Sequence, residues 1–184
     1  MAHRPISDGE LAEQFRDGSD MAFVKLYNRY KRSVYGYCLK MLGDGDEAKD
    51  IVQSVFLKVY EERARLNSPD RFKGWLFTIT HNACLTSRRH LRFYDNGNGG
   101  LERSAVEPSH DEFSRKEESE IVRRVIAGLK PEYREVLILR EYQEFSYREI
   151  ADVVGSTESA VKSRLFAARR RLHECLKPFF EERG

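Results

Sequence analysis

The sequence predicts an all-α protein of two small helical domains joined by a flexible linker, the second of which contains a helix-turn-helix. Apolar residues recur at steps of three and four along almost the whole chain, which is the spacing of amphipathic helices. Near the middle, the run Asp95-Asn96-Gly97-Asn98-Gly99-Gly100 interrupts this pattern with turn-forming residues. A length of 184 residues allows two small domains.

The first domain, residues 8–94, begins with two helices. Ser7 and Glu10 have the spacing of a capping box, in which each side chain accepts a hydrogen bond from the other residue's backbone N–H. A second helix starts near Asp20, and its apolar stripe continues until Gly43, a typical stop residue. The stripe predicts that one face of this long helix is buried.

Two further helices complete the predicted first domain. The third runs from about Asp46, and its apolar residues share one face. Ser68-Pro69 then breaks the helical pattern, because the residue before a proline disfavours helical backbone. The fourth helix follows from about Phe72 and ends in the basic run at 88–92. We expect the four helices to pack as a bundle.

Residues 95–114 are the predicted linker. The surrounding segment 93–118 holds seven acidic residues against three basic ones, and it has few apolar side chains. Such a segment buries too little apolar surface to offset the entropy lost on ordering, so we expect it to be flexible in isolation. Basic segments on both sides of an acidic one indicate two modules and a joint.

The second domain, residues 115–178, has sharper helix boundaries. Pro131 suits the first position of a helix, where its missing N–H costs nothing. Ser146 and Glu149 form another predicted capping box, and Gly155 permits a tight turn after it. We expect Ser156 to cap the last long helix. Two helices joined by a short turn of this kind are a helix-turn-helix.

The last helix has the chemistry of a DNA-recognition helix. Val161 and Leu165 are spaced to anchor it to a core, and residues 160–172 contain no acid. The first turns of such a helix enter the major groove, while lysine and arginine contact phosphates. A basic, solvated helix face that binds nothing is the alternative for a charge run alone. The predicted DNA contacts are Arg148, Thr157, Glu158, Ser159, Lys162, Ser163, Arg164 and Arg169.

Composition excludes several other classes of protein. No apolar run is long enough for a transmembrane helix, and the charged N-terminus argues against a signal peptide, so we expect a cytoplasmic protein. Cys38, Cys84 and Cys175 are widely spaced and give neither a disulfide framework nor a zinc pattern. No catalytic motif is present, so we expect no enzyme activity, metal or cofactor.

The chain resembles the extracytoplasmic-function sigma factors in several motifs. The motifs EIADVVG at 149–155, AVKSRL at 160–165 and ARRRL at 168–172 are similar to the carboxy-terminal region of that family. AKDIVQSVF at 48–56 resembles its polymerase-binding helix, and FKGWLFTI at 72–79 resembles its promoter-melting segment. Thr86 stands where the family commonly has Asp, and His81 where Arg is common.

The resemblance implies a transcription-initiation factor that binds core RNA polymerase and directs it to promoter DNA. The second domain would read the minus-thirty-five element, and the first would hold and melt the minus-ten element. Asp50, Gln53 and Phe56 are assigned to polymerase binding, with Phe56 shared between core and contact. The minus-ten contacts implied are Asn67, Ser68, Asn82, Arg88 and Arg89.

Two alternatives stay open from the sequence, and one regulatory partner is expected. A stand-alone helix-turn-helix regulator would bind DNA as a dimer without polymerase. A sigma-like decoy would bind an anti-sigma protein and never contact DNA. For the leading hypothesis, we expect an anti-sigma protein to clamp between the two domains and mask both surfaces.

Overall fold

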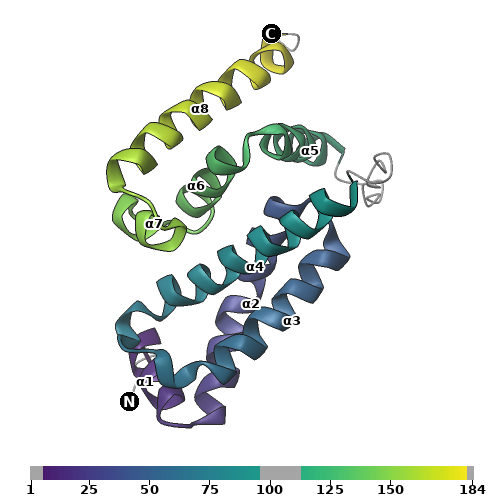
Figure 1. Cartoon of the computed structure of the whole chain (residues 1–184). Coiled ribbons are helices and arrows are strands. Elements are labelled where there is room, and N and C mark those ends of the chain that lie inside the picture. Colours follow the sequence, from purple (N-terminus) through teal and green to yellow (C-terminus); the bar gives the residue numbers. More distant parts are fainter. Residues whose placement is uncertain (1–5, 96–112, 182–184) are drawn as a thin grey trace.

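In the computed structural model of the chain, residues 6–95 and 113–181 are described, and every regular element within them is a helix. The all-α prediction is therefore confirmed. Helices α1 to α4 form an N-terminal group, and α5 to α8 form a C-terminal group that lies along α4 (Figure 1). The elements are α1 Asp8–Arg16, α2 Asp20–Leu42, α3 Gly45–Glu61, the 3-10 turns η1 Arg63–Arg65 and η2 Pro69–Arg71, α4 Phe72–Asp95, α5 Phe113–Gly128, α6 Pro131–Glu141, α7 Tyr147–Val154 and α8 Glu158–Glu181.

Aromatic rings fill much of the N-terminal group's core. Phe15 of α1 is fully buried, and its ring stacks on Phe23 of α2 with 5.3 Å between centroids. The Phe23 ring in turn meets Tyr60 of α3 edge-on at 5.1 Å. The Phe15 ring also lies 6.2 Å from Tyr60 and 6.4 Å from Phe72 at the start of α4, so Phe15 contacts rings from three other helices. Such rings each bury a large apolar area and pack best in offset or edge-on pairs.

The predicted start of α1 and end of α2 are confirmed, whereas α4 continues past the predicted end at 88–92 to Asp95. The Ser7 and Glu10 capping box is present, with Ser7 N–H donating to Glu10 Oε2 at 2.7 Å. Gly43 closes α2 with a φ of 79°, a left-handed conformation that glycine adopts without steric cost. These local signals fix where α1 begins and α2 ends, because each satisfies backbone groups that the helix itself leaves unpaired.

In the C-terminal group, α6, α7 and α8 pack on one another around a smaller core. Ile138, Ile150, Val161 and Ala168 are completely buried, and each comes from one of these three helices. α5 contacts α8 and also α2 of the other group. The core therefore holds the two helices of the helix-turn-helix against α6 at a fixed angle.

The two groups contact each other directly, and the contact of α6, α7 and the turn between them with α2 and α4 is here called the seam. α7 packs against α4, and α6 packs against α2. The predicted linker, 95–114, lies outside the described residues except at its ends, because α4 continues to Asp95 and α5 begins at Phe113. The close pairing is a feature that the prediction of two tethered domains did not include.

Candidate nucleic-acid and polymerase interface

The helix-turn-helix is formed by α7, the turn at Gly155 and α8. Ser146 caps α7: its backbone N–H donates to Glu149 Oε2 at 2.8 Å, and its hydroxyl accepts from Glu149 N–H at 3.3 Å. The Ser146 hydroxyl also donates to Glu149 Oε2 at 2.6 Å, and this hydrogen bond together with the one from the Ser146 backbone N–H lowers the pKa of the Glu149 carboxyl. Gly155 has a φ of 63°, and Ser156 N–H donates to Ala151 O across the turn at 2.9 Å. The predicted capping box and turn are therefore confirmed.

The cap of α8 differs from the prediction. Thr157, not Ser156, holds the N-terminus of α8, with its Oγ1 accepting from Ala160 N–H at 3.1 Å. Ser156 instead bonds back to α7 through its backbone, because the left-handed Gly155 turn directs its N–H toward Ala151. α8 consequently begins one residue later than a Ser156 cap would place it. Thr157 was predicted as a DNA contact, and it remains exposed while it caps the helix.

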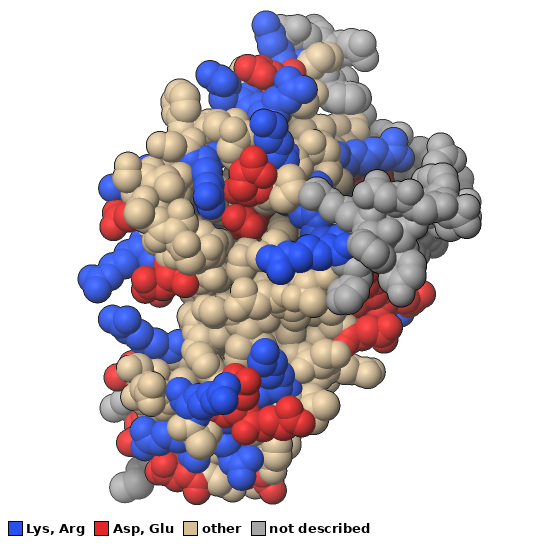
Figure 2. Space-filling model, viewed as in Figure 1, with Lys and Arg blue, Asp and Glu red and all other residues tan. Residues whose placement is uncertain are grey.

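Most of the predicted recognition residues lie on the open side of α8. Val161 and Leu165 are buried, as their spacing predicted. The exposed residues around them, together with Arg148 on α7, are Thr157, Glu158, Ser159, Lys162, Ser163 and Arg169. Figure 2 shows Lys and Arg side chains interspersed with Asp and Glu at the end of the molecule where α8 lies.

Two exposed cations of α8 form surface ion pairs with nearby glutamates. Lys162 Nζ lies 3.0 Å from Glu158 Oε1, one turn earlier. Arg169 donates to Glu141 Oε1 of α6 at 2.6 Å, and this contact raises the pKa of Arg169. Pairs this exposed are worth about 1 kcal/mol or less, so a phosphate can replace the carboxylate at little cost.

Arg164 occupies a different environment from the other predicted DNA contacts. Its side chain is partly buried, and its Nη1 lies 3.5 Å from Glu135 Oε1 of α6. Burial raises the pKa of Glu135 to about 7. Arg164 was predicted as a DNA contact together with Lys162. Its side chain instead points back toward Glu135 of α6 and away from the exposed side of α8.

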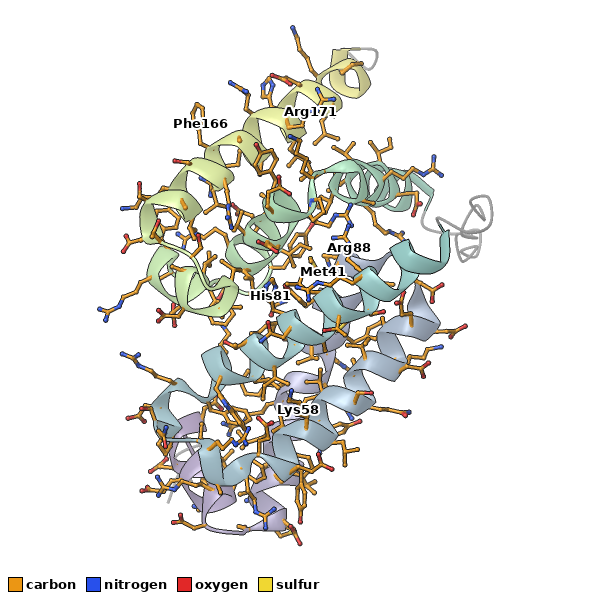
Figure 3. All side chains as sticks on the ribbon, in the orientation of Figure 1. Met41, Lys58, His81, Arg88, Phe166 and Arg171 are labelled. Atoms are coloured by element: carbon orange, nitrogen blue, oxygen red, sulfur yellow. The ribbon has the colours of Figure 1, made fainter. Side chains whose placement is uncertain are left out.

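Phe166 was not singled out from the sequence. Its side chain is 70% exposed, and it lines a groove of ≈ 600 Å³ with Tyr147, Lys162, Arg169 and Arg170. Figure 3 shows Phe166 pointing outward from α8. The sequence carried a signal for it, because an aromatic residue directly after Leu165 falls outside the 161, 165, 168, 172 stripe that faces the core.

The predicted minus-ten loop lies at the edge of the N-terminal group. Asn67 and Ser68 are exposed, while Leu66 beside them is buried and anchors the loop. The loop borders a hollow of ≈ 570 Å³ that Trp75 also lines. The opposite wall comes from the C-terminal group through Arg148, Glu149 and Asp152. Parts of both helix groups therefore enclose this hollow.

The remaining predicted minus-ten residues lie along α4. Asn82 and Arg89 are exposed. Arg88 is partly buried, and its charge acts on Glu135 and Arg134 of α6. Figure 3 shows Arg88 and His81 on the side of α4 that faces the C-terminal group. Arg88 therefore lies between the groups rather than on an open surface.

His81, which stands where the family commonly has Arg, is 3% exposed on the same side of α4. Its Nδ1 lies 3.1 Å from the Tyr37 hydroxyl and 3.9 Å from Glu135 Oε2. Burial lowers the pKa of His81 to about 4. Near pH 7 the ring is therefore neutral, and its contact with Glu135 is not an ion pair.

The predicted polymerase-binding residues divide between surface and core. Asp50 and Gln53 are exposed on α3. Phe56 is 4% exposed, and its ring packs edge-on against Tyr27 at 4.8 Å, so its role in this structure is core packing. Leu57, one turn after Gln53, is 60% exposed and was not singled out from the sequence. It extends the Asp50–Gln53 stripe with an apolar side chain.

Within 6–95 and 113–181, no group of three or more His, Cys, Asp or Glu residues is arranged to hold a metal ion. Cys38 and Cys84 approach to 3.7 Å between sulfurs, as buried free thiols. None of the helices in the described ranges combines the length and apolar character that crossing a membrane requires.

Comparison with known proteins identifies both helix groups. The sigma-70 region 2 family matches residues 26–93, and the sigma-70 region 4 family matches residues 119–172. RNA polymerase sigma factor YlaC of Bacillus subtilis is 31% identical over 161 residues, which cover 85% of this chain and 93% of YlaC. RNA polymerase sigma factor CarQ of Myxococcus xanthus is 30% identical, covering 89% and 94% of the two chains.

A third relative supports a narrower assignment within the sigma-70 family, and a solved structure has the same fold. The ECF RNA polymerase sigma factor SigM of Bacillus subtilis is 30% identical over 83% of this chain and 93% of its own. CnrH, solved in complex with the cytosolic domain of CnrY, superimposes with a TM-score of 0.73 at 26% identity, covering 93% of this chain and 97% of CnrH. The chain belongs to the extracytoplasmic-function group of the sigma-70 family of RNA polymerase sigma factors.

Proposed function

We propose that this sigma factor binds core RNA polymerase in the cytoplasm and directs it to promoters through three separate surfaces. The α3 surface around Asp50 and Gln53 binds polymerase. The exposed side of α8 reads the minus-thirty-five element. The loop at Asn67 and Ser68, with the exposed Asn82 and Arg89 of α4, holds the melted minus-ten strand.

The helix-turn-helix carries the DNA-binding part of the proposal. Its two caps and its buried apolar residues fix α8 on α6 and α7, while Ser159, Lys162, Ser163 and Arg169 stay exposed on one side. A recognition helix requires this combination, because a helix that shifts cannot present the same side chains to base edges. The Asp50–Leu57 stripe supports a second, independent surface on another part of the molecule.

A regulatory partner is also part of the proposal. CnrH was solved with the cytosolic domain of CnrY, and a sigma factor RpoE from Bartonella quintana, which has the same fold at a TM-score of 0.74 and 24% identity, was solved with the anti-sigma factor NepR. We expect an anti-sigma protein to mask this chain in uninduced cells. Co-purification of a partner with the chain at native expression tests this expectation. A chain that is consistently free of a partner in uninduced cells would contradict it.

Run-off transcription tests the main function. Genomic fragments are incubated with core polymerase, with and without the chain, and the transcripts are sequenced. We expect transcripts that start only when the chain is present. The double variant Asp50→Ala, Gln53→Ala should weaken polymerase binding at least about tenfold, because polar contacts at an interface centre commonly cost over 1 kcal/mol. Lys58→Ala, exposed on α3 but off the stripe, is the control.

Duplex binding tests the recognition helix separately. For a promoter found by run-off, the variant Lys162→Ala, Arg169→Ala should reduce the slope of log K against log salt by about 2, because each phosphate contact releases about one counterion. Arg124→Ala on α5 removes a cation that is more exposed than Lys162 and Arg169, and it is the control. Arg164 is left intact because its contact with Glu135 is part of the fold. An unchanged slope, or DNA binding as a dimer without polymerase, would contradict this assignment.

A further inference from the structure

Helix α1 supports the segment 62–71 between α3 and α4, here called the minus-ten loop. It contacts both 3-10 turns of that loop, η1 and η2, as well as the start of α4 (Figure 1). The buried ring of Phe15 meets Phe72, the residue directly after η2, edge-on at 6.4 Å. The sigma-70 region 2 match covers residues 26–93, so α1 lies outside it. The loop is therefore held in part by a helix that the family match does not include.

The first turn of α1 is fastened to α2. The Asp8 carboxylate accepts hydrogen bonds from the Arg29 guanidinium and from the Tyr30 hydroxyl. Arg29 also donates to Ile6 O, just before α1, at 2.6 Å. Tyr30 is 7% exposed, and its ring lies 5.7 Å from the Phe72 ring. These contacts fix the start of α1 relative to α2 and to the start of α4, so α1 is a firm support for the loop.

Gly9, the second residue of α1, lies directly against Asp70 of the loop. A Cβ at position 9 would overlap Asp70 Oδ1, and it would lie 3.4 Å from Asp70 Cγ and 3.6 Å from Asp70 Cα. The loop backbone would therefore accept a methyl group, whereas the carboxylate would have to move. Gly9 is not among the glycines with a positive φ, so its backbone conformation does not require glycine. What the missing side chain provides is space for the Asp70 carboxylate.

The position of this carboxylate matters because the loop side of the neighbouring hollow is basic. Arg65, Arg71 and Lys73 line the hollow, and Asp70 lines it with them. In the structure the Asp70 carboxylate is directed toward Gly9 of α1, since its Oδ1 occupies the place of a side chain there. A carboxylate turned the other way would offset the charge of the three cations and would repel the phosphates of a bound strand.

We propose that Gly9 is a positioning residue for promoter binding: it lets the Asp70 carboxylate lie against α1, so that the minus-ten loop presents its cations and not this anion to the melted strand. The inference rests on the proposed function, which places that strand at the loop. Gly9 itself does not touch the strand. A side chain at position 9 acts through Asp70, because it displaces the carboxylate from α1 toward the basic hollow.

Strand binding by the assembled holoenzyme tests the proposal. The full chain with core polymerase is titrated onto a fluorescent single-stranded oligonucleotide that carries the minus-ten sequence of a promoter found by run-off. Gly9→Ala should bind about fivefold more weakly than the natural chain, because two unit charges about 4 Å apart in water interact by about 1 kcal/mol. Its thermal unfolding temperature should not fall, since alanine favours a helix more than glycine does.

Asp70→Asn provides a readout that a purely structural role would not move. Asparagine keeps nearly the shape of aspartate and removes its charge, so the variant Gly9→Ala, Asp70→Asn should bind the strand within about twofold of Asp70→Asn alone. The matched control is Gly45→Ala in the first turn of α3, where a Cβ would lie 3.5 Å from the Tyr35 hydroxyl. Its strand affinity should equal that of the natural chain, and all variants should bind the minus-thirty-five duplex equally.

Two results would overturn the proposal alone: equal strand affinity for Gly9→Ala and the natural chain, or a loss in Gly9→Ala that Asp70→Asn does not restore. In both cases the natural holoenzyme still binds the strand, so the proposed function stands. A natural holoenzyme that binds the minus-thirty-five duplex but not the minus-ten strand would instead overturn the minus-ten part of the proposed function, and this inference with it.

Discussion

The two helix groups bury different kinds of side chain. The N-terminal group closes around aromatic rings such as Phe15 and Phe72, which its own helices cover. The C-terminal group buries Arg134, Glu135 and Gln143 where α6 and the turn after it meet the other group. An aromatic core is complete within its own group, whereas buried polar side chains require partners on both sides. The comparison indicates that the C-terminal group depends on the seam for part of its stability.

Arg134→Ala should have the largest effect on stability. Arg134 donates to Ile126 O, Ala127 O and Leu129 O at the end of α5 as well as to Met41 O across the seam. Losing a buried guanidinium that serves several carbonyls should lower the free energy of unfolding by about 4 kcal/mol. Urea unfolding followed by circular dichroism measures this. Arg124→Ala, exposed on α5, should change the free energy of unfolding by less than about 0.5 kcal/mol. Equal effects of the two variants would contradict the idea that the C-terminal group depends on the seam for stability.

Two titratable side chains in the seam, Glu135 and His81, should change stability with pH in opposite directions. Burial raises the pKa of Glu135 from 4.5 to about 7, so the folded state binds the extra proton and loses stability as pH rises between these values. Burial lowers the pKa of His81 from 6.5 to about 4, so stability is instead lost as pH falls between these values. The two slopes should nearly cancel from about pH 4.5 to 6.5.

Glu135→Gln should remove one slope and reveal the other. Unfolding free energy of this variant should rise by about 3 kcal/mol or less between pH 4 and 6.5, since one pKa unit corresponds to about 1.4 kcal/mol. Urea titrations at several pH values measure this, with Glu132→Gln on the same helix as control. A flat profile in Glu135→Gln would show that His81 is not buried as described. The charged or titratable side chains that act on Glu135 or lie against it are His81, Arg88, Tyr37, Glu132 and Arg164.

A double-mutant cycle across the seam gives a smaller, sharper measurement. Phe77→Leu and Phe145→Leu, separately and together, should show a coupling of about 1 kcal/mol, the usual value for an edge-on ring pair. Phe15→Leu with Phe23→Leu provides the matched cycle inside the N-terminal group. Coupling within the group but none between Phe77 and Phe145 would mean that the groups are apart in solution.

Ser146→Ala should have the smallest effect, about 1 kcal/mol of unfolding free energy, because it removes a helix cap that the rest of α7 does not replace. Thermal unfolding measures it. Ser163→Ala, exposed in the second turn of α8, should change stability by only a few tenths of a kcal/mol. A larger loss for Ser163→Ala than for Ser146→Ala would contradict the assignment of the cap.

Much of the local structure was predictable because its signals act over a few residues. The capping boxes at Ser7 and Ser146 and the left-handed glycines at 43 and 155 depend on neighbours within one helical turn, and all four were predicted correctly. The cap of α8 was missed because two adjacent residues, Ser156 and Thr157, could both cap a helix. The turn geometry selects Thr157, and that geometry depends on how α7 packs.

The candidate site was predictable to the extent that exposure follows from helical spacing. Asp50, Gln53, Lys162 and Arg169 lie at the surface because they sit off an apolar stripe, and the same rule could have identified Phe166. Arg88, Arg164 and His81 could not be placed this way. Their surroundings come from helices far away in the sequence, which no local pattern specifies.

The sequence by itself determined the all-helical class, the ends of α1, α2 and α7 that carry capping boxes or left-handed glycines, and the helix-turn-helix, because helical periodicity and capping are local properties of the chain. Only the tertiary structure decided that α6 and α7 dock on α2 and α4, that Arg134 reaches Met41, and that Glu135 lies between Arg164 and His81. Such contacts depend on desolvation and shape matching between segments up to about a hundred residues apart, and neither quantity can be read from spacing along one helix.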